Sequence, residues 1–161
     1  MLVVLFSVVI YTDGRFLRIP NALTYPTMAI GLLFGVLEAF PGTIFTNGLI
    51  DHVVGVVLAF AFSYPFYAAG GLKAGDAKLL MAIGAVRGTS FLLVAAVYGA
   101  LIGGVIAVGL IVARRLRAAP DAATGVTMRG VMKTTMPYGI ALSLGGFVAL
   151  ALEVFVTKTT P

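Results

Sequence analysis

The chain has 161 residues, of which 60% are hydrophobic and only 11% are charged. A soluble domain carries roughly 25% charged residues, so this composition excludes an ordinary soluble enzyme, a disordered tail and a nucleic-acid-binding domain. The net charge of +5 does not make a basic groove when the rest of the chain is so apolar. We therefore expect one all-α integral membrane domain over residues 1–161, with no nucleic-acid partner.

Residue types that commonly support chemistry are scarce. The chain contains no cysteine and a single histidine, His52. Without cysteine there is no disulfide, no thiol nucleophile and no cysteine-bound metal. One histidine also argues against a histidine metal cage or a Ser-His-Asp triad. We therefore expect neither a metal nor a cofactor, and any chemistry has to come from a few polar side chains.

Apolar runs divide the chain into six segments. A membrane-spanning helix needs about 20 mainly apolar residues, so the pattern predicts a polytopic bundle of six transmembrane helices. They are expected over residues 1–12, 22–40, 49–69, 76–88, 90–113 and 137–156. Small residues four positions apart, such as Gly99 and Gly103, predict that neighbouring helices pack closely.

Lysines and arginines gather in alternate connections between these segments. Nine lie in the connections 13–21, 70–78 and 114–136, and two lie on the opposite side. Positively charged connections tend to stay in the cytoplasm. We therefore predict a multi-pass protein of the cytoplasmic membrane with these three connections inside and both termini outside. The basic side chains would also contact anionic lipid head groups.

Two of the six acidic residues are unusual in their placement. Asp13 and Asp76 each lie where an apolar segment meets a basic connection, on the same predicted side of the membrane. Each also has a purely structural interpretation, because Asp13 with Gly14 would form a turn that ends a helix and Asp76 would serve as the N-cap of the next helix. Four polar residues near the outer ends are expected to be simple interfacial groups: Glu38, Asp51, His52 and Glu153.

Two motifs surround the unusual aspartates. In the first motif, residues 13–24, Asp13 is followed by Pro20 and Asn21, which end the connection and can begin the next helix. In the second motif, residues 70–80, glycines before the aspartate let the backbone bend sharply and leave room for another backbone to approach. Its notable members are Gly70, Gly71, Lys73, Gly75, Asp76 and Lys78.

With these two motifs the chain resembles the type IV prepilin leader peptidases, which are membrane-embedded aspartic proteases with a glycine-rich aspartate motif. A third motif, residues 136–139 (Met-Pro-Tyr-Gly), is similar to the family's C-terminal Pro-aromatic-Gly signature. Lys73 stands where many members have a further glycine. The chain lacks the four-cysteine region of the long members, so it resembles the short form found in tight-adherence (Flp) pilus systems. Archaeal preflagellin peptidases are a neighbouring alternative.

The resemblance implies that Asp13 and Asp76 are catalytic and that the other motif residues shape the substrate site. Those site-shaping residues are Pro20, Asn21, Gly70, Gly71, Lys73, Gly75 and Lys78. It also implies the substrates, which are prepilin or pseudopilin precursors whose short basic leader is cut at the cytoplasmic face, just before an apolar helix. The sequence does not indicate an oligomeric state.

Two adjacent carboxylates suit peptide hydrolysis because they share one proton. The ionised group takes a proton from water, and the protonated group donates to the carbonyl oxygen. The sequence does not decide which aspartate takes which part, since such a pair titrates as a unit.

Three other interpretations compete with the peptidase. A small proton- or cation-coupled transporter also uses membrane carboxylates, but it predicts acidic groups near the midplane and an internal repeat. Asp13 and Asp76 are instead predicted at one rim, and the sequence shows no repeat. A structural assembly subunit would leave the paired motifs unexplained. An inactive relative of the peptidases would keep the motifs without the activity.

Overall fold

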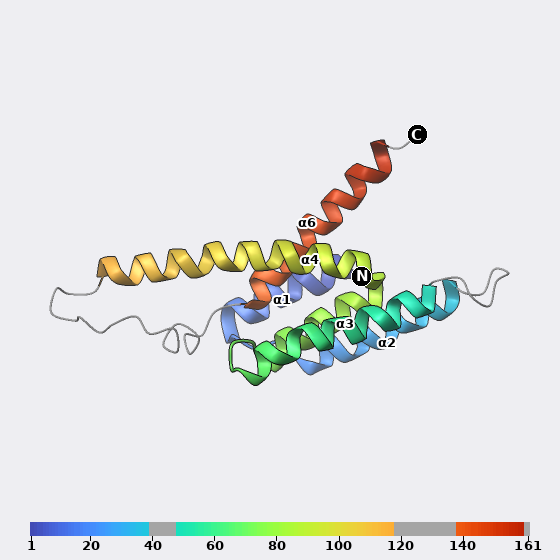
Figure 1. Cartoon of the computed structure of the whole chain (residues 1–161), viewed down its shortest axis with the longest axis horizontal. Coiled ribbons are helices and arrows are strands. Elements are labelled where there is room, and N and C mark those ends of the chain that lie inside the picture. The colour runs from blue at the N-terminus through green and yellow to red at the C-terminus, as the bar shows by residue number, and fades with distance from the viewer. Residues whose placement is uncertain (39–47, 118–137, 160–161) are drawn as a thin grey trace.

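The computed structural model describes residues 1–38, 48–117 and 138–159. Within these ranges every regular element is an α-helix, which confirms the predicted all-α bundle (Figure 1). The helices are α1 (Leu2–Phe16), α2 (Asn21–Glu38), α3 (Gly48–Ala68), α4 (Ala74–Arg117) and α6 (Tyr138–Thr159). Most of the predicted connection 114–136, with Asp121, lies outside the described residues, as do the first two residues of the third motif.

Helix α4 consists of two arms joined at Gly88. This residue has φ 72° and ψ −167°, a backbone conformation that favours glycine. The first arm, residues 74–87, and the second arm, residues 89–117, run in opposite directions (Figure 1). The Asp51 carboxylate of α3 accepts a hydrogen bond from the Thr89 N–H, with Oδ1 at 3.1 Å. Asp51 therefore caps the second arm from a neighbouring helix.

The prediction of six membrane spans is not supported. Among the described residues, three helices are long and apolar enough to cross a membrane: Gly48–Ala68, Ala74–Ala113 and Tyr138–Val156. Helix α1 has 15 residues, or about 22 Å, against a hydrocarbon core of about 30 Å. Helix α2 begins with polar residues, which lower its mean hydropathy. The fourth and fifth predicted spans are the two arms of α4.

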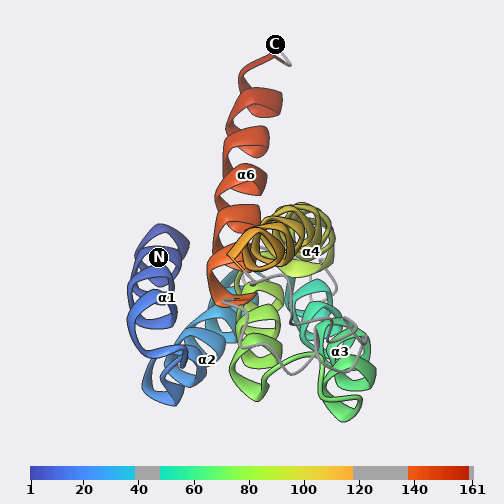
Figure 2. The ribbon, with the colours of Figure 1, turned by 90° about the vertical axis from the view of Figure 1, so that its left-hand side faces the viewer.

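The first arm of α4 forms the centre of the bundle. Its side chains Leu79, Ala82 and Ile83 are completely buried, and α4 contacts α2, α3 and α6. In the end-on view the first arm lies between α2 and α3 (Figure 2). The contact with α3 is made by backbone, because a Cβ added at Gly84 would lie 2.6 Å from the carbonyl carbon of Gly55.

Small residues also join α4 to α6. A Cβ added at Gly145 of α6 would lie 2.3 Å from the backbone nitrogen of Gly99 on the second arm. The predicted role of Gly99 in close helix packing is therefore confirmed. Such packing is typical of helices in lipid, where small residues let the backbones approach.

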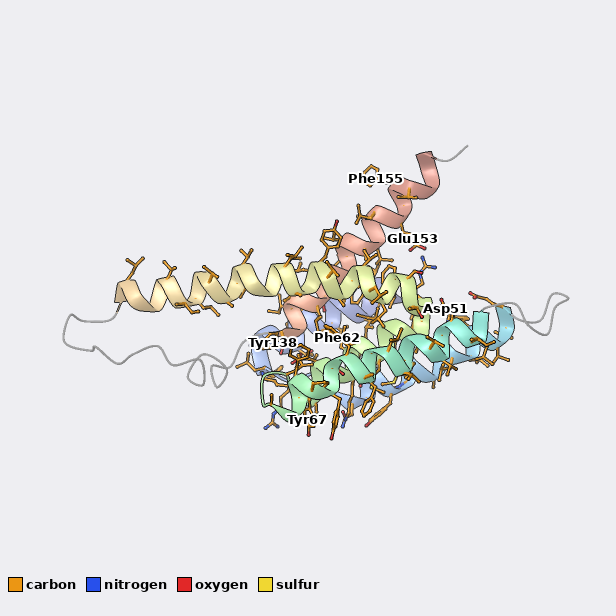
Figure 3. All side chains as sticks on the ribbon, viewed as in Figure 1. Asp51, Phe62, Tyr67, Tyr138, Glu153 and Phe155 are labelled. Carbon is orange, nitrogen blue, oxygen red and sulfur yellow. The ribbon has the colours of Figure 1, made fainter. Side chains whose placement is uncertain are left out.

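The outside of the bundle is apolar. Large side chains such as Phe62 and Val105 are more than half exposed, and Figure 3 shows Tyr67 directed away from the helices. Conversely, the buried titratable residues in the described ranges are Asp13, His52 and Asp76. An apolar exterior around polar interior groups is the distribution expected of a protein surrounded by lipid.

Candidate active site

Asp13 lies in the last turn of α1. The helix continues past Gly14 to Phe16 and ends where Leu17, with φ 52°, donates its N–H to the Asp13 carbonyl oxygen at 3.0 Å. The structural interpretation of Asp13 and Gly14 as a helix-ending turn is therefore wrong. The Asp13 side chain is only 1% exposed, because it points into the bundle rather than into the connection.

The first turn of α6 contacts the Asp13 carboxylate. Its Oδ2 accepts a hydrogen bond from the Ile140 N–H at 3.2 Å. Ile140 is the third residue of α6, and N–H groups in a first helical turn have no partner within their own helix. Gly139 lies beside the same carboxylate, since a Cβ added there would be 2.8 Å from Oδ2. The last residue of the third motif thus belongs to the surroundings of Asp13.

Asp76 occupies the first turn of α4 and is 2% exposed. Its Oδ2 accepts a hydrogen bond from the Lys73 N–H at 3.2 Å. Lys73 immediately precedes the helix, so the contact is half of a capping box, in which the third helical residue reaches back to the N-cap. The structural interpretation of Asp76 as the N-cap itself is therefore wrong by three residues, although its carboxylate does bind a backbone donor.

Gly70 and Gly71 bring the chain from α3 to α4. Gly70 has φ 76°, and its N–H donates to the Tyr67 carbonyl oxygen at 3.0 Å. The Gly71 N–H donates to the Phe66 carbonyl oxygen at 2.8 Å. Together these two bonds form a Schellman motif, which ends α3 and requires a left-handed residue that glycine supplies without strain. The predicted sharp bend before Asp76 is confirmed.

Asp13 and Asp76 line one pocket of about 160 Å³. The volume accommodates several water molecules. The pocket brings together the two aspartates with Leu17, Arg18, Ile19, Lys73 and Gly75. Two buried carboxylates from separate helices therefore share one small cavity at the end of the bundle where α1 ends and α4 begins.

Two lysines tie the second motif to the first. The Lys73 Nζ donates to the Leu17 carbonyl oxygen at 3.1 Å, and the Lys78 Nζ donates to the Asn21 Oδ1 at 2.9 Å. The Lys78 ammonium also lies 4.8 Å from the centre of the Tyr25 ring, in cation–π geometry. The lysines thus hold the connection between α1 and α2 against the start of α4.

The remaining predicted site residues, Pro20 and Gly75, shape the backbone next to the pocket. Pro20 stands just before α2, where its carbonyl oxygen accepts hydrogen bonds from the N–H groups of Leu23 and Thr24. Gly75 leaves space for Ile19, because a Cβ added at Gly75 would lie 3.2 Å from the Ile19 Cβ. Leu17, Arg18 and Ile19 also line the pocket, but they were not among the predicted site residues. They lie inside the first motif, a few positions after Asp13, and this position could have indicated them.

Three of the four polar residues expected to be simple interfacial groups have partners on neighbouring helices, whereas Glu38 is largely exposed, as that expectation requires. The His52 Nδ1 lies 2.7 Å from the Ala85 carbonyl oxygen, and the side chain is buried. Glu153 forms an ion pair with Arg87, and Asp51 caps the second arm of α4 (Figure 3). The expectation for these residues is therefore corrected, because partners from neighbouring helices bind them.

Fold and site together define an α-helical membrane protein with a buried pair of aspartates. The model of the type IV leader peptidase family matches residues 1–108, a range that contains both aspartate motifs. The chain belongs to this family, which is a family of peptidases. No curated protein and no solved structure matches the chain.

Proposed function

We propose that the protein is a membrane-embedded aspartic endopeptidase that removes the basic leader from prepilin-like precursors at the cytoplasmic face of the membrane. The observation that carries this proposal is that the buried residues Asp13 and Asp76 line the same pocket. Family membership supports a leader peptidase, and the pocket supplies the pair of acids that such a hydrolysis needs.

Hydrolysis by the pair follows from one carboxylate being ionised and the other protonated. The ionised aspartate takes a proton from water as the water oxygen bonds to the carbonyl carbon of the substrate. The protonated aspartate gives its proton to the carbonyl oxygen. When the tetrahedral intermediate collapses, a hydroxyl proton returns to the second aspartate, the C–N bond breaks, and the leaving nitrogen takes the proton held by the first. Both carboxyl groups then regain their starting states.

The place of the pocket and the family both support this substrate class. Asp13 lies in the last turn of α1 and Asp76 in the first turn of α4, so both carboxylates are near one end of the helices. A peptide bond at the boundary between a leader and an apolar helix would reach this end while the apolar helix stays in lipid. A transporter with carboxylates near the midplane would need a different placement.

The direct test is to incubate the purified protein, in detergent or lipid, with a candidate prepilin and to follow leader loss by mass spectrometry. The proposal expects one cut between the basic leader and the apolar helix. A control precursor with its leader bond displaced several residues into the apolar helix should stay intact. An intact prepilin under conditions where the peptidase is folded would contradict the proposal.

A further inference from the structure

The third motif has no role in the two-carboxylate chemistry described above, yet its glycine touches Asp13. The Ile140 N–H donates to Asp13 Oδ2, and a Cβ at Gly139 would lie 2.8 Å from that oxygen and 3.0 Å from Cγ. We infer that Gly139 and the backbone of Ile140 position the Asp13 carboxylate, so that the first turn of α6 is part of the active site. This inference rests on the proposed function.

Position 139 is suited to glycine because there is little space beside the Asp13 carboxylate, and not because of its backbone conformation. Among the described residues the glycines with positive φ are Gly70 and Gly88, so an L side chain at position 139 would meet no conformational penalty of that kind. It would instead meet the Asp13 carboxylate, and the Ile19 Cδ1 at 3.0 Å. The Ile19 side chain end can give way, whereas the Asp13 carboxylate can give way only by turning in its pocket, away from the Ile140 N–H that binds it.

Gly146 provides a matched comparison on the same helix. It faces α1 two turns further along α6, where a Cβ would lie 2.3 Å from the ring of Phe6. Gly146 therefore permits the packing of α6 on α1 at a distance from the carboxylates. A substitution there disturbs the same helix pair without touching Asp13.

Displacement of a catalytic group by about 1 Å can lower a rate by about 100-fold. Alanine at position 139 would push the carboxylate away from the Ile140 N–H and change its direction in the pocket. The three atoms nearest to the added methyl group belong to Asp13 and Ile19, so we expect the other residues of the pocket to keep their places and to bind substrate as before. The effect should therefore fall on kcat and leave KM nearly unchanged.

The experiment compares Gly139→Ala with Gly146→Ala in the purified full chain acting on a prepilin peptide. We expect Gly139→Ala to lower kcat by about 10- to 100-fold with KM unchanged, and Gly146→Ala to lower Tm while keeping the kcat of the folded protein. Wild-type kcat in folded Gly139→Ala, or an equal loss of kcat in both variants, would overturn the inference.

A stability measurement tests the contact without any activity. Because the added methyl group strikes the Asp13 carboxylate, Gly139→Ala should lower Tm in the wild-type background and much less in the Asp13→Ala background. Equal losses of Tm in the two backgrounds would overturn the inference even if the protein cleaves prepilin. If the wild type cleaves nothing while the losses differ, the contact stands and the proposed function fails.

Discussion

Each of the two buried carboxylates accepts a hydrogen bond from the backbone at the start of a helix. Asp13 is bound by the first turn of α6, and Asp76 is bound by Lys73 at the start of α4. The N-terminus of a helix carries a partial positive charge, which offsets part of the cost of burying an acid away from water. The site therefore lies where two helix N-termini meet, and Asp13 is brought there by a third helix.

The Lys73 side chain has a definite partner in the Leu17 carbonyl oxygen. Lys73→Met removes that hydrogen bond and keeps the N–H that binds Asp76. We expect the loss of about 1 kcal/mol of stability and a fall of about fivefold in kcat/KM as the connection loosens. Lys73→Arg, which still reaches the carbonyl, should restore most of both. Thermal unfolding and peptide cleavage measure the two effects, and a Met variant equal to wild type would contradict them.

At the scale of helices, the reversal of α4 depends on Gly88 and Asp51 together. A Cβ at Gly88 would lie 1.8 Å from the Asp51 Oδ2, and the residue has a positive φ. We expect Gly88→Ala to destabilise the protein by more than about 2 kcal/mol. Asp51→Ala should cost about 1 kcal/mol as the cap is lost, whereas Asp51→Asn keeps an oxygen for the Thr89 N–H and should cost less. Thermal unfolding in detergent ranks the three, and the opposite order of the two Asp51 variants would refute the cap.

The close contact of α3 with the first arm of α4 gives a second prediction about helices. Gly84→Ala places a methyl group against the backbone of Gly55, which cannot move aside as a side chain would. We expect a loss of about 2 kcal/mol or more. Gly104→Ala is the control, because a Cβ there has nothing within 4 Å, and it should be neutral or stabilising. Equal melting temperatures for the two variants would contradict the contact.

The sequence predicted the positions of the helices better than the number of them that can cross a membrane. The predicted segments 22–40 and 49–69 correspond to α2 and α3 within two residues at each end, because apolar runs bounded by Pro, Gly and Asn are local signals. The span count was too high, since a short or partly polar helix can still pack in the bundle. The helix that contains Asp13 continues to Phe16. The burial of Asp13 against α6 involves Ile140, more than 100 positions away, and no local pattern indicates such a contact.

The two ends of the molecule differ in what the polar residues do. At the end opposite the pocket, His52 joins α3 to the first arm of α4, and Arg87 pairs with Glu153 of α6. Asp51 and His52 were misjudged from sequence because their partners lie 38 and 33 positions away. At the pocket end, the motif residues hold two connections together. Local glycines predicted the bend before Asp76 at this end, whereas the other end depends on contacts between distant segments.

Orientation in the membrane is a property of the whole molecule, and the proposed function requires the pocket end to face the cytoplasm. The chain has no cysteine, so single cysteines at exposed positions report on each end. Ala69→Cys lies beside the pocket end and Ser90→Cys at the opposite end. With an impermeant maleimide on intact spheroplasts we expect Ser90→Cys to react and Ala69→Cys to react only after permeabilisation. The reverse pattern would contradict a cytoplasmic site.

The central claim is that Asp13 and Asp76 form one catalytic unit, and cleavage of a prepilin by their asparagine variants tests it most directly. Asparagine keeps the size and an acceptor oxygen, so the bonds to Ile140 and Lys73 largely survive, but it cannot accept or share the proton. At matched amounts of folded protein, we predict that Asp13→Asn and Asp76→Asn each lower kcat by about 1,000-fold or more, and that the double variant is little worse than either single one. Substantial cleavage by either single variant would contradict the account and leave that aspartate a structural cap.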